Sequence, residues 1–239
     1  TGQVSKVVGG IPAWEDWIEA SLETRLFDDW IGDGLGTLRW LDADTTTGDS
    51  KTTLTHLDAN HPGVLELATG IGTTGAAIRY LGGVISGTGK SGFMVGGGQL
   101  SAEWLVYIDT LSNATDEYNF SLNLTDTISA PTAIIGFIYQ QTSSVNWLGQ
   151  TRSASVTTSV DSGVAVVAGS WIKLKVVVNA AGTSVEFFID GVSVGTSTTN
   201  IPTGTVIAPR VATAKTAGTT SRSTYVDYFK LYQRLTSAR

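Results

Sequence analysis

Two carboxylates on one face of a predicted strand are the residues best suited to chemistry. Glu103 and Asp109 lie in residues 102–109, where apolar and polar side chains alternate. Hydrolysis of a glycosidic bond requires two carboxyl groups roughly 5–9.5 Å apart. Six residues of extended chain, at about 3.3 Å each, separate Glu103 from Asp109 by about 20 Å. The sequence marks no partner carboxylate on another strand, so we predict no catalytic residues.

Zinc chemistry would have to use the only two histidines of the chain, His56 and His61, which flank Asp58. A zinc site needs a third strong ligand at an ordered spacing, and none follows. His61-Pro62-Gly63 has the composition of a turn that leads into a strand at residues 64–67. We therefore predict a turn here and no metal site.

Calcium chemistry would have to use the acidic segment at residues 42–49. Its oxygen ligands would come from Asp42, Asp44 and Asp49. The segment departs from the EF-hand pattern, with two threonines where an acid or Asn and then Gly belong. We expect a solvated loop and no cofactor, with an irregular calcium site at these three aspartates as the alternative.

Two glycine-rich segments resemble nucleotide-binding loops only in part. Residues 70–75 match G-x-G-x-x-G, but no acid lies between Glu66 and Glu103 to bind a ribose. Residues 87–91 resemble the end of a P-loop, but Val84 stands where the motif requires glycine. Both segments are predicted to be loops.

Aromatic residues beside amides are the remaining candidates for ligand contact. Tyr139 precedes two glutamines, and Trp147 follows an asparagine. Sugars bind through aromatic faces and hydrogen-bonding amides. We predict Trp147 and Tyr139 as carbohydrate-binding residues, with core packing as the alternative.

Composition limits the partners and the fold class. The chain has 239 residues, a net charge of −6, no cysteine and 41% hydrophobic residues. It has no basic stripe for nucleic acid and no apolar run of the ~20 residues that a membrane helix needs. We expect neither nucleic-acid binding nor membrane insertion. Without disulfides, the fold must depend on its core and its hydrogen bonds.

Residues 1–26 differ from the rest of the chain. A helical spacing of apolar residues follows Pro12, which suits a first helical position. The residues of this apolar stripe are Trp14, Trp17, Ile18 and Leu22. We predict a short N-terminal helix that acts as an assembly segment, because such an exposed stripe usually marks an interface. A homotrimer is expected, and packing of the helix on its own sheets is the alternative.

From residue 27 the pattern has a period of two, typical of short antiparallel strands. Trp104, Val106 and Ile108 face one way within residues 102–109. Asp190-Gly191 separates two strand-like runs and predicts a type I′ hairpin. No linker divides residues 27–239, so the sequence predicts one all-β, two-sheet antiparallel sandwich.

Several short motifs in residues 27–239 resemble concanavalin A-like (laminin G-like) jelly rolls, and more narrowly jelly-roll proteins of bacteriophage virions. The segments that carry the resemblance are Phe27-Asp28-Asp29-Trp30, His61-Pro62-Gly63, Asn146-Trp147-Leu148-Gly149, Asp161-Ser162-Gly163-Val164, Gly169-Ser170-Trp171, residues 173–179, the Asp190-Gly191 hairpin and residues 226–233.

The resemblance implies a non-enzymatic structural protein on the virion surface, such as a capsid fibre, decoration protein or tail appendage. Its expected partners are other copies of itself, other virion proteins and host cell-surface polysaccharide. A polysaccharide-degrading hydrolase or lyase on the same fold is the alternative. Sandwich glucanases carry E-x-D-x-x-E, and Leu105 replaces the required Asp after Glu103, which argues against an enzyme.

Overall fold

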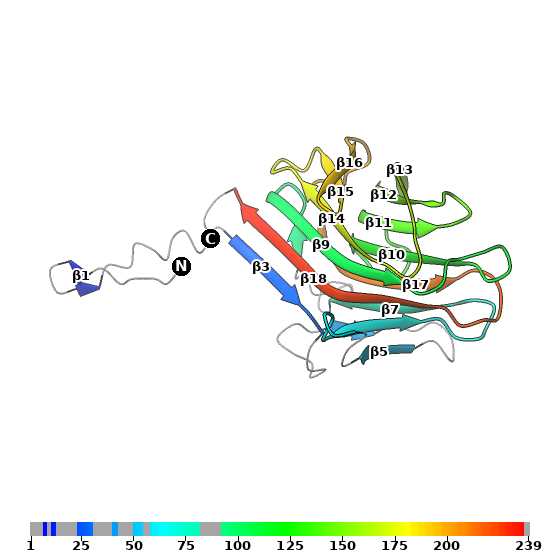
Figure 1. Ribbon diagram of the computed structural model, residues 1–239. Coiled ribbons are helices and arrows are strands. Elements are labelled where there is room, and N and C mark those ends of the chain that lie inside the picture. Colours follow the sequence, from blue (N-terminus) through cyan, green and yellow to red (C-terminus); the bar gives the residue numbers. More distant parts are fainter. Residues whose placement is uncertain are drawn as a thin grey trace.

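A computed structural model describes residues 7–8, 11–12, 23–30, 40–42, 50–54, 58–81 and 92–236. Within these ranges the ordered elements are strands, and no helix occurs. No helix of the described residues is long and apolar enough to cross a membrane. Figure 1 shows a sandwich of two antiparallel sheets, so the predicted all-β class is confirmed.

Sheet 1 has the strand order β16-β15-β14-β9-β18-β6-β5, with β3 also paired to β18. Its strands are β3 (Glu23–Asp28), β5 (Ser50–Leu54), β6 (Val64–Ala68), β9 (Gly98–Ile108), β14 (Trp171–Val178), β15 (Val185–Ile189), β16 (Val192–Ser197) and β18 (Ser223–Leu235).

Sheet 2 has the order β13-β12-β11-β10-β17-β7-β4, with β8 also paired to β17. Its strands are β4 (Trp40–Asp42), β7 (Gly75–Leu81), β8 (Phe93–Met94), β10 (Tyr118–Thr125), β11 (Ile134–Gln140), β12 (Asn146–Ser153), β13 (Val156–Ala165) and β17 (Val206–Lys215).

The core lies between the two sheets and consists of the inward residues of each alternating strand. Trp104 on β9 is fully buried and packs against Phe229 of β18, with ring centroids 5.6 Å apart. Phe137 of sheet 2 meets Phe187 of sheet 1 edge to face at 5.4 Å. Thr213 and Thr224 form a buried hydrogen bond between the sheets. The period-two pattern therefore decides which residues are inside.

Strand and turn predictions in the second half of the chain are confirmed. Residues 102–109 lie on β9 and its end, with Trp104 and its even-numbered neighbours inside. Asp190 and Gly191 have φ of 49° and 84°, as a type I′ turn requires. Gly70–Thr74 is an irregular connection, and residues 58–63 form a turn before β6. Residues 87–91 lie outside the described part.

The N-terminal prediction is wrong at two points. Ile11–Pro12 forms strand β2, paired with β1 (Val7–Val8), so Pro12 does not begin a helix. β3 starts at Glu23 and pairs with β18, so residues 23–26 belong to the sandwich. The period-two pattern thus begins four residues earlier than predicted. Trp14, Trp17, Ile18 and Leu22 lie outside the described residues.

Candidate functional site

One row of side chains crosses the outward face of sheet 2 on five neighbouring strands. Its members are register partners in the order Tyr80, Arg210, Asn123, Gly136 and Gln150. We call this set the polar row. β7, β17, β10, β11 and β12, which carry it, lie side by side in Figure 1. Strands about 4.8 Å apart give the row a length of about 19 Å.

The members of the polar row point outward because their sequence neighbours are in the core. Leu122 and Leu124 flank Asn123 and are fully buried, as is Val211 beside Arg210. Two residues along each strand, the next outward row is mainly apolar. That second row contains Ile78, Ala212, Ser121, Ile138 and Leu148. The sheet therefore presents a polar strip beside an apolar one.

The centre of the polar row is rigid. With its amide nitrogen facing the carbonyl oxygens, Asn123 donates to Phe137 and Leu122 at 3.3 and 3.1 Å. Gly136 cannot carry a side chain, because a Cβ would lie 2.1 Å from the Leu122 oxygen. The Asn123 side chain therefore lies over the backbone of Gly136, which is buried.

Arg210 is the charged member of the polar row and is half-buried. Its Nη1 donates to the Ser121 hydroxyl at 3.2 Å. Burial lowers the pKa of Arg210 to about 10, so the side chain remains cationic at neutral pH. Tyr80, its neighbour on β7, is 9% exposed.

The outward face of sheet 1 carries more charges, and its carboxylates have partners. Glu103 accepts a hydrogen bond from Tyr228 at 2.8 Å and lies 3.6 Å from Lys230. Glu23 accepts from Tyr232 at 2.6 Å and from Arg25 at 2.7 Å. Burial, and next in size the hydrogen bond to Glu103, raise the pKa of Tyr228. These pairs stabilise the sheet and leave little charge for a ligand.

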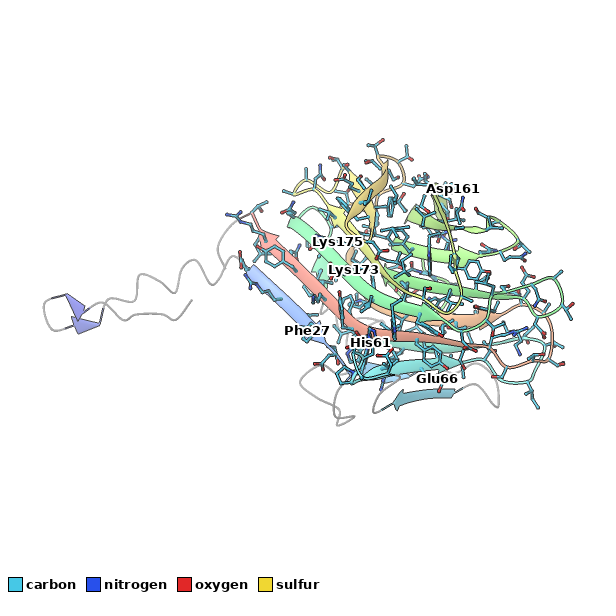
Figure 2. All side chains as sticks on the ribbon, viewed as in Figure 1. Phe27, His61, Glu66, Asp161, Lys173 and Lys175 are labelled. Atoms are coloured by element: carbon cyan, nitrogen blue, oxygen red, sulfur yellow. The ribbon has the colours of Figure 1, made fainter. Side chains whose placement is uncertain are left out.

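Glu66, also on sheet 1, likewise has hydrogen-bonding partners. It accepts a hydrogen bond from Ser223 at 2.7 Å and lies 3.3 Å from the Tyr225 hydroxyl. Burial and the neighbouring Glu66 raise the pKa of Tyr225 to about 12. Figure 2 labels Glu66 together with Phe27, His61, Lys173 and Lys175.

His61, Trp171 and Asp227 form a cluster at the surface of sheet 1. His61 stacks on Trp171 with ring centroids 4.0 Å apart, and its Nδ1 lies 3.0 Å from Asp227 Oδ2. Nδ1 has no hydrogen-bond partner with suitable geometry, so the two side chains are close without forming a hydrogen bond. A register shift between Val226 and Tyr228 gives β18 an extra residue at Asp227, and such bulges re-aim side chains.

A metal ion is not favoured at this cluster. Within the described ranges, no group of three or more His, Asp or Glu side chains could hold one. The calcium alternative at Asp42, Asp44 and Asp49 involves side chains outside the described residues.

Trp147 and Tyr139 require a correction. Both are 1% exposed, and their ring centroids lie 6.2 Å apart inside the core. A ring covered on both faces cannot stack on a sugar, so the core-packing alternative holds. Gln140, next to Tyr139, points outward because strand neighbours alternate.

The polar row was not predicted from the sequence, although one signal was present. β17 reads Val-Ile-Ala-Pro-Arg-Val-Ala-Thr-Ala-Lys, in which Arg210 is the one charge before the final Lys215. A lone cation in such a run indicates either a paired side chain elsewhere in the fold or a binding site for an anion.

The family of this chain follows from a sequence comparison. The profile described as "SO2946-like, C-terminal domain" matches residues 60–227, more than half of the chain. The chain belongs to this family. Within it, the crystal structure of a protein of unknown function, SO2946 from Shewanella oneidensis MR-1, superposes with a TM-score of 0.62 at 14% identity, covering 98% of this chain and 99% of that one. No curated protein sequence matches.

Similar folds also occur in carbohydrate-active proteins. The endo-β-1,4-glucuronan lyase of the fungus Trichoderma reesei has a TM-score of 0.61 and 12% identity, with 87% of this chain and 95% of that chain covered. An endo-1,3-β-glucanase from Streptomyces sioyaensis gives 0.59 and 13%, with coverage of 89% and 96%. The carbohydrate recognition domain of Emp47p gives 0.55 and 11%, with coverage of 90% and 96%. These likenesses identify a concanavalin A-like jelly roll.

Proposed function

We propose that the protein is a non-enzymatic module that binds a polysaccharide along the polar row of sheet 2. The row itself carries the proposal. Its half-buried guanidinium and amide, on Arg210 and Gln150, lie in one row with the 9% exposed Tyr80 and the 3% exposed Asn123 over about 19 Å, beside an apolar strip. Sugars need both, because hydroxyl groups require hydrogen-bonding partners and ring faces pack on apolar surface. The similar folds of a carbohydrate recognition domain and of two polysaccharide-active enzymes support it.

The absence of acids from the row supports binding over hydrolysis. Among the described residues its five members include no carboxylate, and a glycosidase needs two. Glu103 lies on the opposite sheet, in the middle of β9, and Asp109 follows the end of that strand.

A glycan array followed by calorimetry tests this proposal. We expect Tyr80→Phe and Gln150→Leu each to weaken binding about 2- to 10-fold, the effect of losing one hydrogen bond. Lys175→Met, on the outward face of sheet 1, is the control and should leave affinity unchanged. If the wild-type protein binds no glycan, or if only the control variant loses affinity, the proposal fails.

A polysaccharide-degrading lyase or hydrolase is the second candidate, because two of the similar structures are such enzymes. It predicts release of unsaturated products or reducing ends from the bound polysaccharide. Loss of that release in Tyr80→Phe would assign the chemistry to the polar row, and loss in Glu103→Gln would assign it to sheet 1.

We further propose that the module is displayed on a virion surface and self-associates. The short motifs shared with bacteriophage jelly-roll proteins support this assignment. Immunogold labelling of particles with an antibody against the sandwich tests it, and label found only in the unassembled fraction would contradict it.

A further inference from the structure

Arg210 has too few partners for a half-buried cation. Its one hydrogen bond within the described part of the chain runs from Nη1 to Ser121, although a guanidinium carries five N–H donors. Its Nε is buried and lacks a partner. No carboxylate of the described residues forms an ion pair with it. Buried charges are normally paired, so this side chain lacks the anion that would compensate it.

Among the residues that the structure describes, the strands beside Arg210 do not supply that anion. Its register neighbours across β7 and β10 are Tyr80 and Asn123, both uncharged. On sheet 1, by contrast, Glu23 and Glu103 each lie against a cation. General attraction does not account for the site either, since the chain carries a net charge of −6 and repels polyanions overall.

We propose that Arg210 binds the carboxylate of an acidic sugar, so that the polar row selects polysaccharides that contain uronic acid. This inference rests on the proposed function and adds the chemical class of the ligand. A guanidinium matches a planar carboxylate through two parallel N–H···O bonds. The Tyr80 hydroxyl and the Gln150 amide then bind neighbouring sugar hydroxyls along the row.

Calorimetry with hexasaccharides tests the inference. The ligands are the hexamers of glucuronic acid and of galacturonic acid and, for each acid that binds, its carboxyl-reduced form and that reduced form sulfated to the same charge. We expect at least one uronic acid to bind about tenfold or more tightly than its reduced form. Arg210→Met should lower this affinity about 10- to 100-fold, the effect of losing a charged hydrogen bond, and change binding of the reduced form less than about twofold.

Two controls separate binding from folding. Lys173→Met removes one exposed positive charge on sheet 1, changes net charge equally, and should leave all affinities unchanged. Thermal unfolding of Arg210→Met should occur at the same or a higher temperature than that of the wild type, because an uncompensated buried charge is removed. A sharply lower unfolding temperature would make Arg210 a structural residue and overturn the inference.

The remaining outcomes are also decisive. Equal binding of the acidic and reduced sugars overturns the role of the carboxylate and leaves polysaccharide binding standing. Tighter binding of the sulfated form overturns the choice of carboxylate as the anion. If no sugar of any class binds in the array or the calorimeter, both proposals fail.

Discussion

His61, Trp171 and Asp227 come from distant segments and meet on the outward face of sheet 1. Each belongs to a different motif that resembles the jelly-roll family. The Trp40 indole similarly donates to Asp28 at 2.6 Å, and Asn146 donates to Asp161 at 2.8 Å. At this scale residues of the family motifs join segments of the sandwich: β3 to β4, β12 to β13, and the turn at His61 to β14 and β18.

His61→Ala should lower the free energy of unfolding by about 2 kcal/mol. The change removes the stacking on Trp171 and the imidazole that lies 3.0 Å from the Asp227 carboxylate, whose side chain is 12% exposed. Urea denaturation followed by tryptophan fluorescence measures the loss. Asp58→Asn is the control and should cost less than about 0.5 kcal/mol, because Asp58 is 48% exposed and 3.9 Å from the ring. Equal losses in both variants would contradict the assigned role of Asp227.

At the scale of elements, two loops at one end of the sandwich are joined by Asp116. Its carboxylate accepts a hydrogen bond from the Thr220 backbone N–H at 3.0 Å and one from Arg222 at 3.1 Å. The Thr220 bond, with help from Arg222, holds the pKa of Asp116 below its ordinary value of 3.8. These bonds connect the loop between β9 and β10 to the loop between β17 and β18.

The stability of this link should depend on pH. Because the folded pKa of Asp116 is lower than the unfolded one, the ionised carboxylate stabilises the fold above about pH 4. That contribution is lost as pH falls below 3.8 toward the folded pKa. The difference in free energy of unfolding between the wild type and Asp116→Asn should thus be constant from about pH 5 to 7 and shrink in acid. A difference that grows in acid would show that folding raises the pKa of Asp116 instead of lowering it.

The strands were predictable because their signals are local. Alternation in residues 102–109 and the Asp190-Gly191 turn require no knowledge of distant partners. The polar row was not predictable, since Tyr80 and Arg210 are 130 positions apart and become neighbours only through strand register. Tyr139 was misassigned for a related reason. An aromatic ring beside an amide does not reveal which of two alternating faces it occupies.

At the scale of the whole molecule, the two sheets share one core, and β1 and β2 form a further pair of short strands near the N-terminus. β3 brings residues 23–28 onto sheet 1, beside the last strand, as Figure 1 shows. The expected assembly segment is therefore residues 1–22, four residues shorter than the sequence pattern indicated.

Residues 1–22 should control the oligomeric state. We expect light scattering to give a trimer for the full chain and a monomer for a chain that begins at Glu23, because the predicted interface residues are removed. A Trp14→Ser, Trp17→Ser variant of the full chain is the control against truncation artefacts and should also be monomeric. A trimer that persists after truncation would place the interface on the sandwich.

The pairing of β3 with β18 has a mechanical consequence. The strands are antiparallel, and Glu23, at the start of one, lies opposite Arg234, near the end of the other. Tension applied between residues 23 and 235 therefore acts at one end of the ladder and breaks its hydrogen bonds one after another, as in unzipping. Force applied from β3 to a ligand held on sheet 2 instead loads the core between the sheets, where all contacts must yield together. The domain should accordingly peel open under low force between its two ends and resist a much larger force between its N-terminal strand and a bound ligand.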